Sequence, residues 1–129
     1  MTFPQAISNG FRCFMSTTGR ASRSEFWYWY LFVAILSMIV GICTVMAGEN
    51  DSIVASFEKL FSIIFSVSVL CAGIRRLHDI GKSGWNVCWA LIPIVGGIYL
   101  IVLYCRASDP YDNKYGPGEY GAPNEYEDY

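Results

Sequence analysis

The residues from Phe26 to Ala47 form an apolar run of 22 residues that contains no charged side chain. As an α-helix this run is about 33 Å long, which is enough to cross the roughly 30 Å hydrocarbon core of a bilayer. It opens with the sequence Phe-Trp-Tyr-Trp-Tyr, and aromatic side chains are enriched where a membrane helix meets the lipid headgroups. The run is longer and more aromatic than the apolar part of a cleaved signal peptide. We therefore predict a transmembrane helix over residues 26–47.

Two more apolar segments predict transmembrane helices over residues 53–74 and 85–104. The first of them contains Glu58 and Lys59, which lie near one end of the segment and can extend their charged groups to the interface. The second is about 30 Å long as a helix, and we expect Pro93 to kink it. Apolar residues make up 53% of the 129-residue chain, and a soluble protein of this size cannot bury three such segments.

The two ends of the chain differ in character from the predicted spans. In residues 1–18 the apolar side chains of Phe3, Ile7 and Phe11 recur on one helical face, which predicts a short amphipathic helix in the membrane interface. The alternative is a frayed N-terminus, because Asn9-Gly10 weakens the helix. Residues 106–129 contain three prolines and an acidic end, and we expect them to be extended or disordered. The predicted fold class is thus an all-α membrane protein with three spans.

The distribution of charge predicts the orientation in the membrane. The net charge is only −2 and gives no indication of a nucleic-acid partner, but the positive residues gather before the first span and between the second and third. The turn at 48–52 has no Lys or Arg. The positive-inside rule then places the N-terminus in the cytoplasm, this turn outside, the loop at 75–84 inside and the C-terminus outside.

Five separated motifs make the chain similar to a known family. They are Gly19-Arg20-Ala21-x-Arg23-x-Glu25-x-Trp27, Arg75-Arg76-Leu77-His78-Asp79, Ser83-Gly84-Trp85, Leu91-Ile92-Pro93 and Asn113-Lys114-Tyr115-Gly116-Pro117. In this order, they resemble the bacterial family called domain of unknown function 805. The resemblance implies a small, multi-pass bacterial inner-membrane protein, and it brings no activity and no ligand set. The chain departs from the family at Asn86, where members often have a second Trp, and in its acidic, tyrosine-rich end at residues 119–129.

One concentrated polar cluster is the candidate functional site. In a structural interpretation its arginines fix the topology and Asp79 or Glu25 neutralises one of them. In a binding interpretation the cluster holds anionic lipid headgroups or a phosphorylated partner, since each Lys or Arg near an anionic surface contributes about 1 kcal/mol. The candidate binding residues are Arg20, Arg23, Arg75, Arg76, His78 and Lys82, with Glu25 and Asp79 as charge partners.

Other functional classes have weaker support in the sequence. His78 beside Asp79 is a candidate general acid or base, but no nucleophile accompanies the pair, and we do not expect an enzyme. The five cysteines include no Cys-x-x-Cys pair, so neither a metal site nor a cofactor is expected. A channel or transporter subunit requires an oligomer, for which Ser37 and Gly41 offer a small-residue packing face. We expect an accessory membrane protein that contacts lipids, a second copy or a membrane protein partner through its basic cytoplasmic face.

Overall fold

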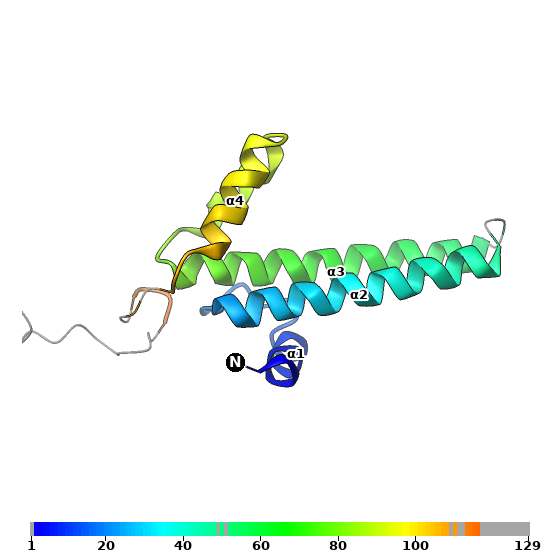
Figure 1. Ribbon diagram of the computed structural model, residues 1–129, viewed down its shortest axis with the longest axis horizontal. Helices are drawn as coiled ribbons and strands as arrows, with labels where there is room; N and C mark the ends of the chain where they lie inside the picture. The colour runs from blue at the N-terminus through cyan, green and yellow to red at the C-terminus, as the bar shows by residue number, and fades with distance from the viewer. Residues whose placement is uncertain (1, 49, 51, 109, 111–112, 117–129) are drawn as a thin grey trace, which may run out of the picture.

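The computed structural model describes residues 2–48, 50, 52–108, 110 and 113–116 (Figure 1). This part of the chain is helical apart from turns and an isolated bridge between Asn113 and Gly116, which confirms the predicted all-α class. The tail expected to be extended falls partly outside these residues. The elements are α1 (Phe3–Arg12), α2 (Arg23–Ala47), α3 (Ser52–Asp79), the 3₁₀-helix η1 (Gly84–Leu91) and α4 (Val95–Cys105).

Helices α2 and α3 form a long antiparallel pair joined by a turn at its far end (Figure 1). The N-terminus of α2 is fixed by Ser22, whose hydroxyl accepts a hydrogen bond from the backbone N–H of Glu25 at 3.2 Å, as expected of an N-cap. With 25 and 28 residues, the two helices are long and apolar enough to cross a bilayer. In the most apolar stretch of 18 residues of each helix, only 6% is buried inside the protein. So large an exposed apolar surface is typical of helices solvated by lipid.

Helix α1 crosses the N-terminal part of α2 and packs around Trp29 (Figure 1). The rings of Phe11 and Phe14 meet the indole edge-to-face, with centroids 5.2 and 6.0 Å away. A Cβ on Gly10 would lie 2.1 Å from the same indole, so glycine permits this close approach. The indole N–H donates to the hydroxyl of Ser68 on α3 at 2.9 Å. The Asn9-Gly10 pair therefore belongs to the packed part of a helix.

The segment 85–104 does not form the single continuous helix that its composition predicts. It forms a hairpin of η1 and α4, in which Trp89 contacts Tyr99 at a ring distance of 5.0 Å. Ile92 is extended, as expected for a residue before proline, and Ile94 has a positive φ of 66°. A Cβ on Gly96 would lie 1.6 Å from the carbonyl oxygen of Trp89. The break occurs at Pro93 as expected, but it reverses the chain instead of bending a helix.

Candidate functional site

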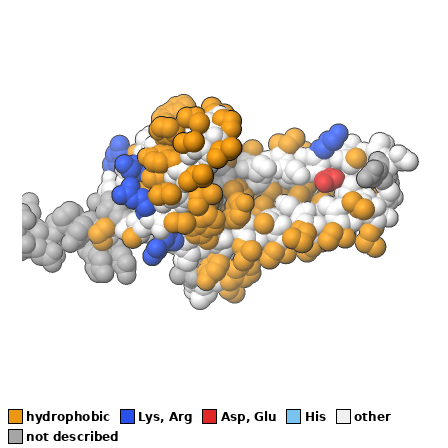
Figure 2. Space-filling model, turned by 45° about the horizontal axis from the view of Figure 1, so that its top comes forward, with side chains coloured by type: hydrophobic (Ala, Val, Ile, Leu, Met, Phe, Trp, Pro, Cys, Tyr) orange, Lys and Arg blue, Asp and Glu red, His pale blue; other side chains and the backbone are white. Residues whose placement is uncertain are grey.

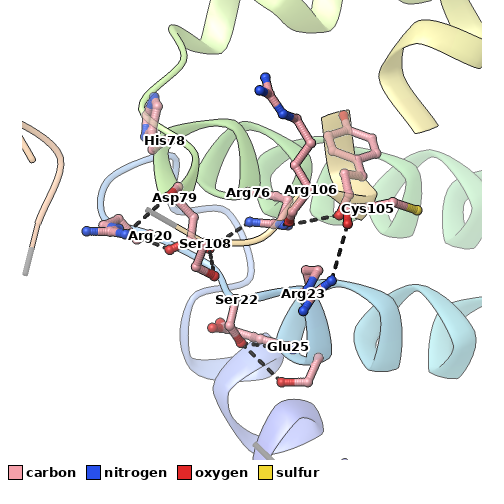
Figure 3. Close-up of polar contacts among 12 residues, drawn as sticks. Arg20, Ser22, Arg23, Glu25, Arg76, His78, Asp79, Cys105, Arg106 and Ser108 are labelled. Carbon is pink, nitrogen blue, oxygen red and sulfur yellow. Dashed lines mark hydrogen bonds and ion pairs between the residues drawn. The ribbon is translucent and has the colours of Figure 1, made fainter. Parts of the chain in front are cut away.

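The end of α3 carries a network of buried ionic contacts centred on Asp79 (Figure 3). The carboxylate of Asp79 accepts hydrogen bonds from Arg20 Nε at 3.0 Å, from Arg76 Nη1 at 2.6 Å and from the hydroxyl of Ser108. These partners come from the α1–α2 loop, from α3 itself and from the segment after α4. One carboxylate thus ties together three parts of the chain that are distant in sequence.

A second buried ion pair joins α2 to α3. Arg75 Nη1 lies 2.8 Å from Glu25 Oε1, and the two side chains are 5% and 7% exposed. The same carboxylate oxygen accepts a hydrogen bond from the side-chain amide of Asn9 on α1. An ion pair this deeply buried is strongly destabilising when one partner is removed, because the other charge is left without compensation.

The arginines of this network also bind the carbonyl groups at helix ends. Arg76 donates from Nε to the Tyr104 carbonyl at 3.1 Å and from Nη2 to the Arg106 carbonyl. Arg20 donates from Nη2 to the carbonyl of Asp79 at 3.0 Å, and Arg23 donates from Nη1 to that of Cys105 at 3.4 Å. The last carbonyls of a helix have no intrahelical partner and carry partial negative charge. The guanidinium groups therefore cap both α3 and α4.

His78 lies at the edge of the network and is not hydrogen-bonded to Asp79 in the described part of the chain. Its Nδ1 donates to the Gly19 carbonyl at 3.2 Å. The imidazole ring stacks on Tyr115, with centroids 3.9 Å apart and planes within 1° of parallel. The side-chain amide of Asn113 donates to the backbone carbonyl of His78 at 3.0 Å. In Figure 3 the imidazole and the Asp79 carboxylate point in different directions. The His–Asp couple considered as an acid–base pair is thus not assembled.

The sequence-predicted site residues divide into a buried and an exposed set. The side chains of Arg20, Arg75 and Arg76 are 7%, 5% and 0% exposed, and they serve contacts within the chain. Arg23 and Lys82 are exposed, and His78 is intermediate. Arg106 and Lys114 were not among the predicted site residues, because the positive-inside rule predicts that the C-terminal tail lies outside the cell. The exposed cations near this end, which we call the cationic rim, are Arg12, Arg23, Lys82, Arg106 and Lys114.

Comparison with known proteins assigns the chain to a family. The family described as "Protein of unknown function (DUF805)" matches residues 14–117. The chain belongs to the DUF805 family. It is 33% identical over 103 residues to the inner membrane protein YhaH of Escherichia coli K12, covering 77% of this chain and 83% of that protein. It is 31% identical over 106 residues to the inner membrane protein YhaI of the same strain, covering 80% and 85%. No solved structure matches.

Residues from three of the five motifs that carry the DUF805 resemblance meet at one place in the structure. Arg20 of the first motif bonds to Asp79 of the second, and it also donates from Nη1 to the Gly116 carbonyl of the last motif at 3.3 Å. Arg75 bonds to Glu25, and Tyr115 stacks on His78. The two long apolar helices and the relatives show that this DUF805 member is an integral membrane protein, and these three motifs contribute to its polar end.

Proposed function

We propose that this protein is an accessory protein of the bacterial inner membrane that binds anionic lipid headgroups through its cationic rim. The supporting observation is an excess of exposed positive charge at the end of the molecule that carries the Asp79 network. Its exposed cations surround a network in which Glu25 and Asp79 are buried and already bonded to arginines. Figure 2 shows Lys and Arg side chains gathered at this end beside a hydrophobic surface. Cations at the edge of a lipid-facing surface are well placed to meet phosphate groups.

The proposal includes a topology with two spans. Helices α2 and α3 cross the bilayer, whereas α4, with 11 residues, is about 16 Å long and reaches only half of a 30 Å core. The η1–α4 hairpin begins shortly after α3 ends, and it finishes where Arg76 and Arg23 bond to the carbonyls of Tyr104 and Cys105, so both of its ends lie at the basic end. We infer that the hairpin enters the cytoplasmic leaflet and returns. This replaces the third span and places Arg106 and Lys114 in the cytoplasm instead of outside.

The same topology assigns a position to α1. Figure 1 shows this helix beside the N-terminal part of α2, on the side away from α4, and the side chains of Phe3 and Phe11 are 37% and 51% exposed on its apolar face. Arg12, in its last turn, is also exposed. We propose that α1 lies in the cytoplasmic interface, with its aromatic side chains among the upper parts of the lipid chains and its cation among the headgroups.

Lipid retention tests this function directly. The wild-type protein, purified in mild detergent and examined by native mass spectrometry, is expected to retain anionic phospholipid. The variant Arg23→Gln/Lys82→Gln/Arg106→Gln loses three rim cations and should bind more than about a hundredfold more weakly, because each contributes about 1 kcal/mol. Lys59→Gln, near the opposite end of α3, is the matched control and should leave retention unchanged.

Two outcomes would overturn the proposal. The first is a wild-type protein that retains zwitterionic and anionic lipids equally, since the rim would then have no headgroup preference. The second is a triple variant that retains as much anionic lipid as the control. A co-purifying membrane protein lost only in the triple variant would make the rim a protein-binding surface instead. The channel-subunit and enzyme alternatives stay predictions without a supporting contact in the described residues.

A further inference from the structure

A cleft of about 340 Å³ lies between the long helix pair and the η1–α4 hairpin. Its volume is within the range of about 300–1,000 Å³ found for pockets that bind small molecules. The side chains lining it are almost all apolar or aromatic, and Tyr30, Leu70 and Ile101 are 49%, 46% and 54% exposed. The cleft is therefore open along its side, where we place the hydrocarbon of the bilayer. Lining residues include Phe26, Trp27, Val69, Leu70, Ala90 and Tyr104.

The cationic rim meets this cleft at Arg23. On α2 the lining residues Phe26, Trp27 and Tyr30 follow Arg23 at intervals of three, four and seven positions, and such positions share one face of a helix. The bond from Arg23 Nη1 to the Cys105 carbonyl also holds the guanidinium beside the end of α4, which forms the opposite wall. A guanidinium has five donors, and this bond uses one of them. An exposed cation therefore stands at the cytoplasmic end of an apolar cleft.

We propose that this cleft seats one acyl chain of an anionic phospholipid and that Arg23 binds the phosphate of the same molecule. This inference rests on the proposed function and gives it a location. The apolar walls exclude a free phosphate or a soluble anion as the complete ligand, because neither would use the cleft. A phospholipid uses both parts, since its chain covers the exposed aromatic surface of α2 and its phosphate offers two non-bridging oxygens that a guanidinium can bind together.

A photoreactive lipid tests the location. The full-length protein is placed in vesicles of phosphatidylglycerol and phosphatidylcholine in equal parts, with a trace of phosphatidylglycerol carrying a diazirine on one acyl chain. After irradiation, mass spectrometry of the peptides is expected to find the label on residues 66–70 of α3 and near Ala90. The Arg23→Gln variant should reduce this labelling about fivefold, while labelling by a diazirine phosphatidylcholine, which has no net charge, should change little.

Replacing either of two alanines with tryptophan distinguishes binding in the cleft from binding to the general lipid-facing surface. Ala90→Trp fills the cleft and should remove most labelling of residues 66–70. Ala47→Trp adds the same side chain to an exposed position at the far end of α2 and should leave it unchanged. The labelling map of the wild-type protein tests the location of the lipid even if either variant fails to fold. Anionic lipid that labels other surfaces, unaffected by Ala90→Trp, would overturn the cleft while leaving the rim function intact. Equal labelling by both lipids would overturn the rim function itself.

Discussion

Replacing Asp79 with Asn removes the negative charge that Arg20 and Arg76 share. Both guanidinium groups are buried, and the side chain of Arg76 has no exposed surface. Breaking a buried ion pair by removing one partner costs about 3–5 kcal/mol. The Asn side chain still accepts a hydrogen bond, so we expect a loss near the lower limit, about 3 kcal/mol of unfolding free energy. For a chain of this size this corresponds to a fall of about 10 °C in melting temperature.

The natural cysteines provide the assay for this loss. Cys71 on α3 is 7% exposed, so a thiol-reactive fluorescent dye reaches it only as the helices separate. We would replace the other four cysteines with Ser and heat the protein in detergent with the dye. Glu58→Gln is the matched control, because this half-buried carboxylate of α3 lies far from the network, and it should melt close to the parent.

The double variant tests the physical reason. If the cost arises from an uncompensated buried charge, Arg76→Met/Asp79→Asn should be less destabilised than the sum of the two single variants. A melting temperature for Asp79→Asn within about 2 °C of the parent would show that the network contributes little, since this equals well under 1 kcal/mol. In that case the packing around Trp29 would be sufficient to hold this end together.

Three further predictions concern the packing and the topology. Gly10→Ala should destabilise the protein by at least about 1–3 kcal/mol in the same assay, because its methyl group overlaps an indole ring, whereas Gly41→Ala, with open space around it, should not. Gly96→Ala should increase hydrogen exchange across the η1–α4 hairpin, because its methyl group overlaps a backbone carbonyl, and Gly97→Ala, which meets no atom within 4 Å, serves as its control. In a cysteine-free background, Lys114→Cys should react with a membrane-impermeant maleimide in inverted vesicles only; reaction in right-side-out vesicles would restore the three-span topology.

The two long helices are the part of the fold that local sequence determines. The predicted segments 26–47 and 53–74 lie within α2 and α3. Continuous apolar runs of this length favour helix wherever water is absent, because a helix satisfies its own backbone groups. Each helix is a few residues longer than predicted at the basic end. There the N-cap of α2 and the charged end of α3 continue the helical hydrogen bonds beyond the apolar run.

The hairpin could not be deduced from composition, because a span and a hairpin of the same length contain the same apolar residues. Pro93 predicted a break but not its angle. The reversal depends on the close approach at Gly96 and on the bonds that bring Tyr104 and Arg106 to the end of α3. Those contacts join positions that are distant in the chain, such as Arg76 and Arg106, and periodicity carries no information about them. For the same reason, the sequence did not predict that Arg106 and Gly116 lie beside this network.

The site was predicted as a cluster of charges, but its internal pairing was not. The interpretation that Asp79 or Glu25 neutralises an arginine agrees with the ion pairs. What sequence could not separate is which cations serve the fold and which remain at the surface. Arg75 and Arg76 are adjacent to each other and both buried, while Arg23, three positions from Arg20, is exposed. Burial of these side chains depends on the tertiary structure, because the loop before α2 crosses the end of α3.

The ties between the end of α3 and the segment after α4 have a consequence for biosynthesis. Arg76 needs the carbonyls of Tyr104 and Arg106, and Arg20 bonds to that of Gly116. At about 5–20 residues per second, the ribosome needs roughly 2–8 s to extend the chain from Arg76 to Gly116. Both long helices are therefore synthesised while Arg20 and Arg76 still lack these acceptors. The order of synthesis makes the basic end the last part of the protein to mature, and a chain stopped before residue 104 leaves it unfinished.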